Sequence, residues 1–444
     1  MKEQIQLSDH FSYKRLIKFV LPSVVMMIFI SIYGVVDGLF VSNFCGKPAL
    51  TAVNIIFPLM MIIGGFGFML GTGGTAIVAK TLGMGQKQKA NEYFTFITAF
   101  TAVLGILLAT TAIVFARPIA ILFKADGEVL DLAVKYVRIV LIGMPFFMLQ
   151  NLFQNFFITA EKPKLGLAVT IAAGVTNMLL DALFVAILKW GIEGAAAATA
   201  ISQFVGGIIP VAYFASKNTS TLRFCKTHLY FRMILDACVN GSSELMSNIS
   251  SSLVTILYNA QLMSIDPENG VAAYSAIMYV AFIFISIFIG FVIGSSPIVS
   301  FHYGAENADE LKNLRKKSVN LMFISGSAMV VTALALSIPL CKLFVGYDAE
   351  LYKVTLRGFI IYAFSYAITG FNIFGSAFFT ALNNGLISAI ISFLRTLVFQ
   401  ISAVIILPLI FGIDGVWFSV IVAELLSALV TVIFLVAKQK RYQY

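Results

Sequence analysis

The chain contains little charge. Charged residues make up only 11% of its 444 residues, whereas 59% are hydrophobic, and the mean hydropathy is +0.94. Soluble domains carry about 25% charged residues. The composition therefore excludes an ordinary soluble protein and places the chain among membrane proteins with many spans. We expect the lipid bilayer to be its principal partner.

Cysteine and histidine are also scarce. The four cysteines show no paired spacing and the three histidines are scattered, so the sequence predicts neither a disulfide framework nor a zinc site. No histidine falls in the middle of an expected membrane span. An enzyme within the membrane would need a nucleophile–base set or a metal cluster. We therefore expect no enzymatic activity and no cofactor beyond a coupling ion.

The net charge of +9 is compatible with nucleic-acid binding or with a membrane protein's charge bias. Most Lys and Arg fall in the amino terminus, in alternate loops and in the carboxyl terminus, as the positive-inside rule requires. We therefore expect both termini in the cytoplasm, a multi-pass protein of the cytoplasmic membrane, and no nucleic-acid partner. The polar first residues lead directly into an apolar helix, so we expect no cleaved signal peptide.

Long apolar runs, separated by Gly, Pro, Asn and charged residues, predict an all-α integral membrane protein. The basic loop 216–232 divides the spans into two groups of six. The expected domains are an amino-terminal lobe at 1–215, a cytoplasmic linker at 216–233 and a carboxyl-terminal lobe at 234–444. The twelve expected transmembrane helices are 15–42, 49–79, 92–116, 132–159, 165–188, 194–215, 234–264, 271–300, 313–340, 351–381, 385–410 and 414–437.

The two halves are also an internal repeat. Sliding the chain along itself by 221 residues, without gaps, places Gly191-Ile-Glu-Gly194 on Gly412-Ile-Asp-Gly415. The same shift places Thr159-Ala160 on Thr380-Ala381. Six helices per half make the two copies parallel, so the fold is expected to be two pseudo-symmetric six-helix bundles. Repeats of this kind, with a site between or inside them, are typical of transporters.

Few ionisable residues fall inside the expected helices, and two of them are acids of the amino-terminal half. At a rise of about 1.5 Å per residue, Asp37 and Thr199 lie about 9 Å below the outer surface, Asp181 about 12 Å and Asn177 about 18 Å. These oxygens could bind a small cation such as Na⁺, or the acids could share a proton. Each could instead cap or bind a neighbouring helix. The repeat places Tyr258 and Ser402 at the matching positions of the second half, which lacks the pair.

The first expected helix combines this acid with a proline. Pro22, Tyr33 and Asp37 fall on one stripe of the helix, so the position where a bend is expected and the charge share a face. A carboxylate inside a spanning helix usually marks an ion or substrate path. This face is the leading candidate for the working part of the molecule.

Further polar and aromatic side chains suggest a cavity for lipophilic cations. Aromatic rings and Met suit bulky cations, although ordinary packing explains them nearly as well. Glu244 could face a central cavity or bind a neighbouring helix, and Arg395 is expected to neutralise Glu424 in the second bundle. The candidate cavity residues are Gln150, Gln154, Asn155, Gln203, Tyr274 and Met278.

The chain resembles the multidrug and toxic compound extrusion (MATE) transporters over essentially its whole length, with the MepA-like bacterial branch as the most similar group. The marks are Leu21-Pro22, Asp37, Thr176-Asn177 with Asp181, and Thr199 after Gly191-Ile-Glu-Gly194. The resemblance implies that Asp37, Asn177, Asp181 and Thr199 form a cation site, that helix 1 bends at Pro22, and that Tyr33 supports the site.

The resemblance also implies a function. We expect an antiporter, driven by H⁺ or Na⁺, that exports organic cations and other lipophilic drugs and works as a monomer. The alternative is a flippase for a lipid-linked precursor, but an anionic pyrophosphate headgroup would require several inward basic residues, and only Arg395 qualifies.

Overall fold

The computed structural model describes residues 5–444, and these residues form helices, turns and connections without a strand. Each of the twelve stretches expected to span the membrane coincides with a helix or a pair of helices. The amino-terminal lobe consists of α1 (Tyr13–Phe40), α2 (Lys47–Gly83), α3 (Lys87–Val114), the short α4 (Ala116–Leu122), α5 (Gly127–Thr159), α6 (Pro163–Asp181) and α7 (Gly191–Ala215).

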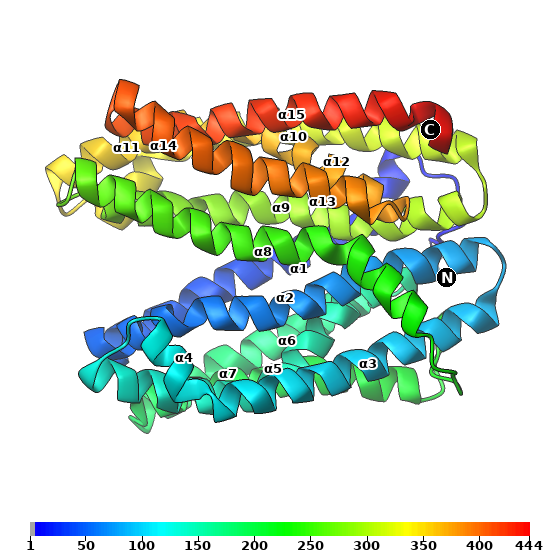
Figure 1. Cartoon of the computed structure of the whole chain (residues 1–444), viewed down its shortest axis with the longest axis horizontal. Coiled ribbons are helices and arrows are strands. Elements are labelled where there is room, and N and C mark those ends of the chain that lie inside the picture. Colours follow the sequence, from blue (N-terminus) through cyan, green and yellow to red (C-terminus); the bar gives the residue numbers. More distant parts are fainter. Residues whose placement is uncertain (1–4) are drawn as a thin grey trace.

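The carboxyl-terminal lobe follows a connection without regular structure that ends where α8 begins. Figure 1 shows the two lobes side by side, with both chain ends at the same end of the bundle. The helices of this lobe are α8 (Phe231–Ile265), α9 (Gly270–Gly304), α10 (Ala308–Val345), α11 (Ala349–Ala363), α12 (Tyr366–Ala381), α13 (Gly385–Phe393), α14 (Gln400–Phe411) and α15 (Ile413–Tyr442).

Length and composition agree with a membrane-spanning bundle. Ten helices of the described chain are long and apolar enough to cross a membrane. The pair α11 and α12 makes an eleventh span that is bent by 50°, so the single helix expected at 351–381 is wrong. α8 is 35 residues long but rich in Ser and Asn, which lowers its hydropathy. It packs along α2 and α13, so it has protein neighbours for its polar side chains.

Three short π-helical turns interrupt the bundle, none of them expected from the sequence. They are η1 (Val41–Cys45) after α1, η2 (Ala182–Ile187) after α6, and η3 (Leu394–Phe399) between α13 and α14. Such turns bond each N–H to the carbonyl five residues back and are frequent at functional sites. Here η1 follows Asp37 by one helical turn, and η2 begins directly after Asp181.

The lobes touch through two pairs of contacts that the repeat relates to each other. A Cβ on Gly73 of α2 would overlap the carbonyl of Ala237 and crowd Gly241 of α8, and a Cβ on Gly294 of α9 would lie 2.9 Å from Val20 of α1. The shift that defines the repeat places Gly73 on Gly294 and Val20 on Gly241. Glycine at such crossings lets two backbones approach closely. The structure therefore contains the pseudo-symmetry that the sequence predicts.

A second reciprocal contact lies nearer the end that holds both termini. A Cβ on Gly83 would overlap the carbonyl oxygen of Phe301, and a Cβ on Gly304 would overlap that of Lys80. These residues join the end of α2 to the end of α9. The repeat places Gly83 on Gly304 and Lys80 on Phe301, so each contact is the repeat-related copy of the other. The closest backbone contacts between the lobes thus include the region of the chain termini.

The segment before α1 connects the lobes at the same end. Leu7 donates its backbone N–H to Glu161 at 2.8 Å, after α5, and Phe11 donates to Glu310 at 2.9 Å, in α10. Both side chains are buried, and Lys317 donates to the carbonyl of Phe11 at 2.6 Å. Residues 7–11 are therefore held by one carboxylate from each lobe.

Candidate functional site

Two helices of the amino-terminal lobe present the predicted acids to each other. Asp37 lies in the last turn of α1, and Asp181 is the last residue of α6, which packs along α1. The Asp37 carboxyl lies next to the Asp181 carboxyl and the Asn177 amide and interacts with both. Asp181 and Asn177 are fully buried and Asp37 is half-buried. The structure thus brings three of the four predicted ion-site residues into direct contact.

The contact between the two acids has a chemical consequence. Ionised carboxylates only accept hydrogen bonds, so neither can donate to the other. In the described structure, Oδ1 of Asp37 and both carboxyl oxygens of Asp181 are buried without a donor. A shared proton or a small cation would satisfy these oxygens and reduce the repulsion between the charges.

Thr199, the fourth predicted residue, reaches the site through a tyrosine that the sequence analysis missed. Tyr136 lies next to Thr199 and is close enough to Asp37 and Asp181 to interact with both charges. Tyr136 is buried in α5. Counted from the observed start of α5 at Gly127, it lies about 14 Å along the helix, a depth that could have identified it.

Tyr33 and Pro22 lie on α1, as predicted. The rings of Phe29 and Tyr33 are 5.9 Å apart and cover Gly174 of α6, where a Cβ would lie 2.5 Å from Phe29 and 3.1 Å from Tyr33. This glycine lets α1 approach α6 directly below the acids. Pro22 removes one helical hydrogen bond, yet α1 runs as one helix from Tyr13 to Phe40. The bend at Pro22 stays a prediction.

The polar residues proposed to line a substrate cavity are buried between helices in this conformation. Gln150 covers Gly206 of α7, Gln203 covers Gly143 of α5, and Asn155 lies against Gly71 of α2. None of the four exceeds 6% exposure. All four side chains are therefore packed between helices, and facing glycines provide the space for Gln150, Asn155 and Gln203. Their place in a substrate cavity stays a prediction.

Tyr274 and Met278 lie in the other lobe. Tyr274 is 7% exposed and its ring stacks on Tyr258 with centroids 5.0 Å apart, while Met278 packs against the same core. Packing, the alternative left open for these residues, accounts for their positions in this conformation.

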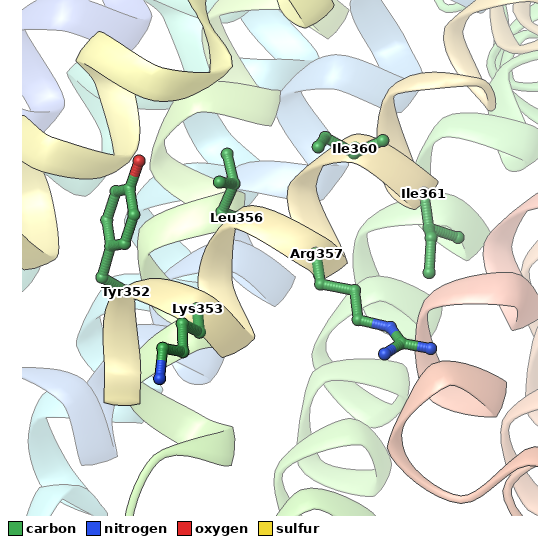
Figure 2. Close-up of a pocket in the computed structure, with 6 residues that line it drawn as sticks. All are labelled: Tyr352, Lys353, Leu356, Arg357, Ile360 and Ile361. Atoms are coloured by element: carbon green, nitrogen blue, oxygen red, sulfur yellow. The ribbon is translucent and has the colours of Figure 1, made fainter. Parts of the chain in front are cut away.

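An open groove of about 390 Å³ lies on the outside of the carboxyl-terminal lobe. Figure 2 shows its six lining residues, which all come from α11 between Tyr352 and Ile361. None belongs to the acid site. The groove therefore gives no support for a substrate cavity at the predicted residues.

The predicted neutralisation of Arg395 by Glu424 is confirmed. Arg395 donates from Nη2 to Oε1 of Glu424 at 2.6 Å and from Nε to both carboxyl oxygens at 3.0 and 3.2 Å. Glu244 differs, since no ion pair or hydrogen bond of its carboxyl occurs within residues 5–444.

Two repeat-related lobes of membrane-length helices, with two acids facing each other at the ends of two neighbouring helices, define a membrane transporter. The MatE family model matches residues 22–183 and 245–406, one stretch in each lobe. The chain therefore belongs to the MatE family.

Curated relatives match the chain over nearly its full length. The multidrug export protein MepA of Staphylococcus haemolyticus is 22% identical over 437 residues, which cover 97% of this chain and 94% of that protein. MepA of Staphylococcus aureus strain MRSA252 is 21% identical over 426 residues, covering 94% and 92%.

Solved structures show the same fold. A MATE transporter in complex with MaL6 has a TM-score of 0.92 at 22% identity and covers 100% of both chains. A MATE transporter of the MOP superfamily in an outward-facing conformation has a TM-score of 0.93 at 21% identity, covering 100% of this chain and 99% of that one. The protein is accordingly a multi-pass membrane protein with the MATE fold.

Proposed function

We propose that the protein is an antiporter that exchanges H⁺ or Na⁺ for organic cations and other lipophilic compounds, which it exports. Family membership and the MepA relatives, described as multidrug export proteins, support export. The observation that carries ion coupling is the contact between the Asp37 and Asp181 carboxyls, whose buried oxygens have no basic partner among the described residues.

Coupling follows from different ion affinities of two lobe arrangements. An ion from outside binds Asp37 and Asp181, whose helices α1 and α6 pack against each other. α1 then bends near Pro22, where one backbone hydrogen bond is missing, and the space for the drug shrinks. A ligand shifts such an equilibrium only by its difference in affinity for the two states. The drug leaves outward, and the ion later leaves inward.

The orientation that suits this cycle places both termini in the cytoplasm of a bacterial cell. The basic residues of the termini and of the alternate loops support it through the positive-inside rule. The acid site then lies in the outer half of the membrane. One chain contains the complete site, so we propose that the monomer is the working unit.

The oxygens at the site suit either ion. A proton needs only the two acids, whereas Na⁺ prefers several oxygen ligands, which Asn177 and Thr199 could add. Purified protein in proteoliposomes separates these cases. Drug uptake that follows an imposed pH gradient without Na⁺ indicates H⁺ coupling, and uptake that follows an imposed Na⁺ gradient at constant pH indicates Na⁺ coupling.

The decisive variant is Asp37→Asn. We expect it to abolish ethidium efflux from cells that lack other pumps, while the protein still inserts into the membrane. Asp131→Asn is the matched control, since Asp131 lies in the same lobe with its side chain 65% exposed. Efflux in Asp37→Asn equal to that of the control would refute the proposed coupling.

The flippase alternative has less support. A pyrophosphate headgroup needs free basic side chains within the membrane, and Arg395 is already bound to Glu424. Proteoliposomes with a fluorescent lipid-linked pyrophosphate would favour the flippase if the lipid, and not ethidium, crossed the bilayer. Membership of a transporter family also favours transport over an enzymatic reaction.

A further inference from the structure

The carboxyl-terminal lobe contains an ion pair between a buried carboxylate and a partly exposed guanidinium. Glu424 of α15 is 6% exposed and accepts three hydrogen bonds from Arg395 of η3. Asn372 of α12 donates to Oε2 of Glu424 at 2.6 Å and to its backbone carbonyl at 2.8 Å. Both oxygens of this carboxylate therefore have donors. The proposed function assigns no role to the pair.

The repeat shows what the amino-terminal lobe has at the matching positions. The shift that defines the repeat places Arg395 on Gly174 and Glu424 on Gln203. In the amino-terminal lobe, the rings of Phe29 and Tyr33 cover Gly174. The positions of these rings match Ser250 and Val254 of α8, which are smaller. The space that the Phe29 and Tyr33 rings fill in the amino-terminal lobe thus corresponds to the space that the Arg395 guanidinium fills in the carboxyl-terminal lobe.

The two lobes therefore balance their buried charges differently. Asp37 and Asp181 have no Lys or Arg partner among the described residues, so an external ion must neutralise them. Glu424 has a cation attached to the chain itself. Arg395 lies within one to two helical turns of the residues that match Asn177 and Asp181, at a similar level of the lobe.

We propose that Arg395 is a tethered cation, which fills in the carboxyl-terminal lobe the role that H⁺ or Na⁺ fills in the amino-terminal lobe. The carboxyl-terminal lobe then binds no coupling ion, and exchange is confined to Asp37 and Asp181. Arg395 is a positioning residue that occupies the Glu424 carboxyl through its three hydrogen bonds. The inference rests on the proposed function for its account of the amino-terminal lobe.

Loss of the guanidinium should turn Glu424 into an ion-binding site. Besides Arg395, the titratable groups that face Glu424 are Tyr258 from α8 and Tyr362 from α11. Both phenols are neutral between pH 5 and 8. In Arg395→Gln, Glu424 therefore keeps its hydrogen bond from Asn372 but has no cation, and it must take up a proton or Na⁺. In the double variant Arg395→Gln/Glu424→Gln, neither charge remains.

The experiment compares thermal unfolding of the purified wild type, Arg395→Gln and the double variant at pH 5 and pH 8. We expect Arg395→Gln to unfold below the double variant at pH 8, and the gap to close by about 2 °C or more at pH 5, where protons to neutralise the unpaired carboxylate are a thousand-fold more concentrated. Added Na⁺ at pH 8 reveals whether Na⁺ also fills the site. Equal curves for the two variants at both pH values would overturn the proposal. It would also fail if Arg395→Gln cannot be purified even at pH 5 while the double variant can.

A transport measurement separates this proposal from the proposed function. The number of cations exchanged per drug, measured from the gradient that just stops transport, should rise by one in Arg395→Gln and return to the wild-type value in the double variant. An unchanged number in Arg395→Gln would overturn the tethered cation. Failure of the proposed function would appear elsewhere, as ion-coupled efflux that survives in Asp37→Asn.

Discussion

Substituting Gly83 or Gly304 should separate the lobes at the end of the bundle that holds both termini. A methyl group on Gly304 overlaps the carbonyl oxygen of Lys80, and one on Gly83 overlaps that of Phe301. Both obstacles are backbone atoms, which cannot rotate away as a side chain can. Gly304→Ala and Gly83→Ala therefore relieve the overlap only if the ends of α2 and α9 move apart.

The size of the effect follows from the cost of overpacking. An extra methyl in a close-packed contact costs about 1–3 kcal/mol. Applied to the equilibrium between closed and separated lobe ends, this corresponds to roughly a 5- to 150-fold shift towards separation. A conformation populated at a few per cent would then become readily detectable.

The assay measures the distance between spin labels on exposed Gln88 of α3 and Lys312 of α10, in a cysteine-free background in lipid nanodiscs. We expect a larger population at long distance in both variants. Gly34→Ala is the matched control, because a Cβ at Gly34 of α1 meets no atom within 4 Å. Folded Gly83→Ala and Gly304→Ala proteins with the wild-type distance distribution would refute this reasoning.

Two further substitutions examine the ion site and the segment before α1. Tyr136→Phe removes the hydroxyl beside Thr199. A neutral hydrogen bond contributes about 0.5–1.5 kcal/mol, so we expect half-maximal exchange in proteoliposomes to require roughly 2- to 10-fold more H⁺ or Na⁺. An unchanged requirement would remove Tyr136 from the site. Phe11→Ala empties a fully buried position and should lower the free energy of unfolding by about 3–5 kcal/mol, visible as a lower unfolding temperature. Phe44→Ala, at a side chain 56% exposed, should change little, and equal shifts would contradict the assignment.

Much of the fold and the centre of the ion site could be predicted because a helix has a fixed rise. Long apolar runs determined where helices exist, and a rise of about 1.5 Å per residue placed Asp37 and Asp181 at similar depth. The contact between these carboxyls in the structure agrees with that estimate. The pairing of Arg395 with Glu424 could be predicted because buried charges in a membrane require a partner.

Other features could not be predicted from the depth of a residue along its expected helix. α5 begins at Gly127 and not at 132. Tyr136 would lie about 6 Å from the expected start of this helix, but it lies about 14 Å from the observed start. The break between α11 and α12 falls at Phe364 and Ser365, where no proline or glycine indicates it. The burial of Gln150 and Gln203 depends on Gly206 and Gly143 lying opposite, which is a tertiary arrangement.

The contacts of residues 7–11 impose an order on the synthesis of the protein. Phe11 finds its acceptor, Glu310, only after most of the chain has left the ribosome, and Leu7 requires Glu161. While the first lobe inserts, the leading residues lack half of their binding site. Their docking is therefore one of the last steps of assembly, because it requires both lobes to have inserted and folded.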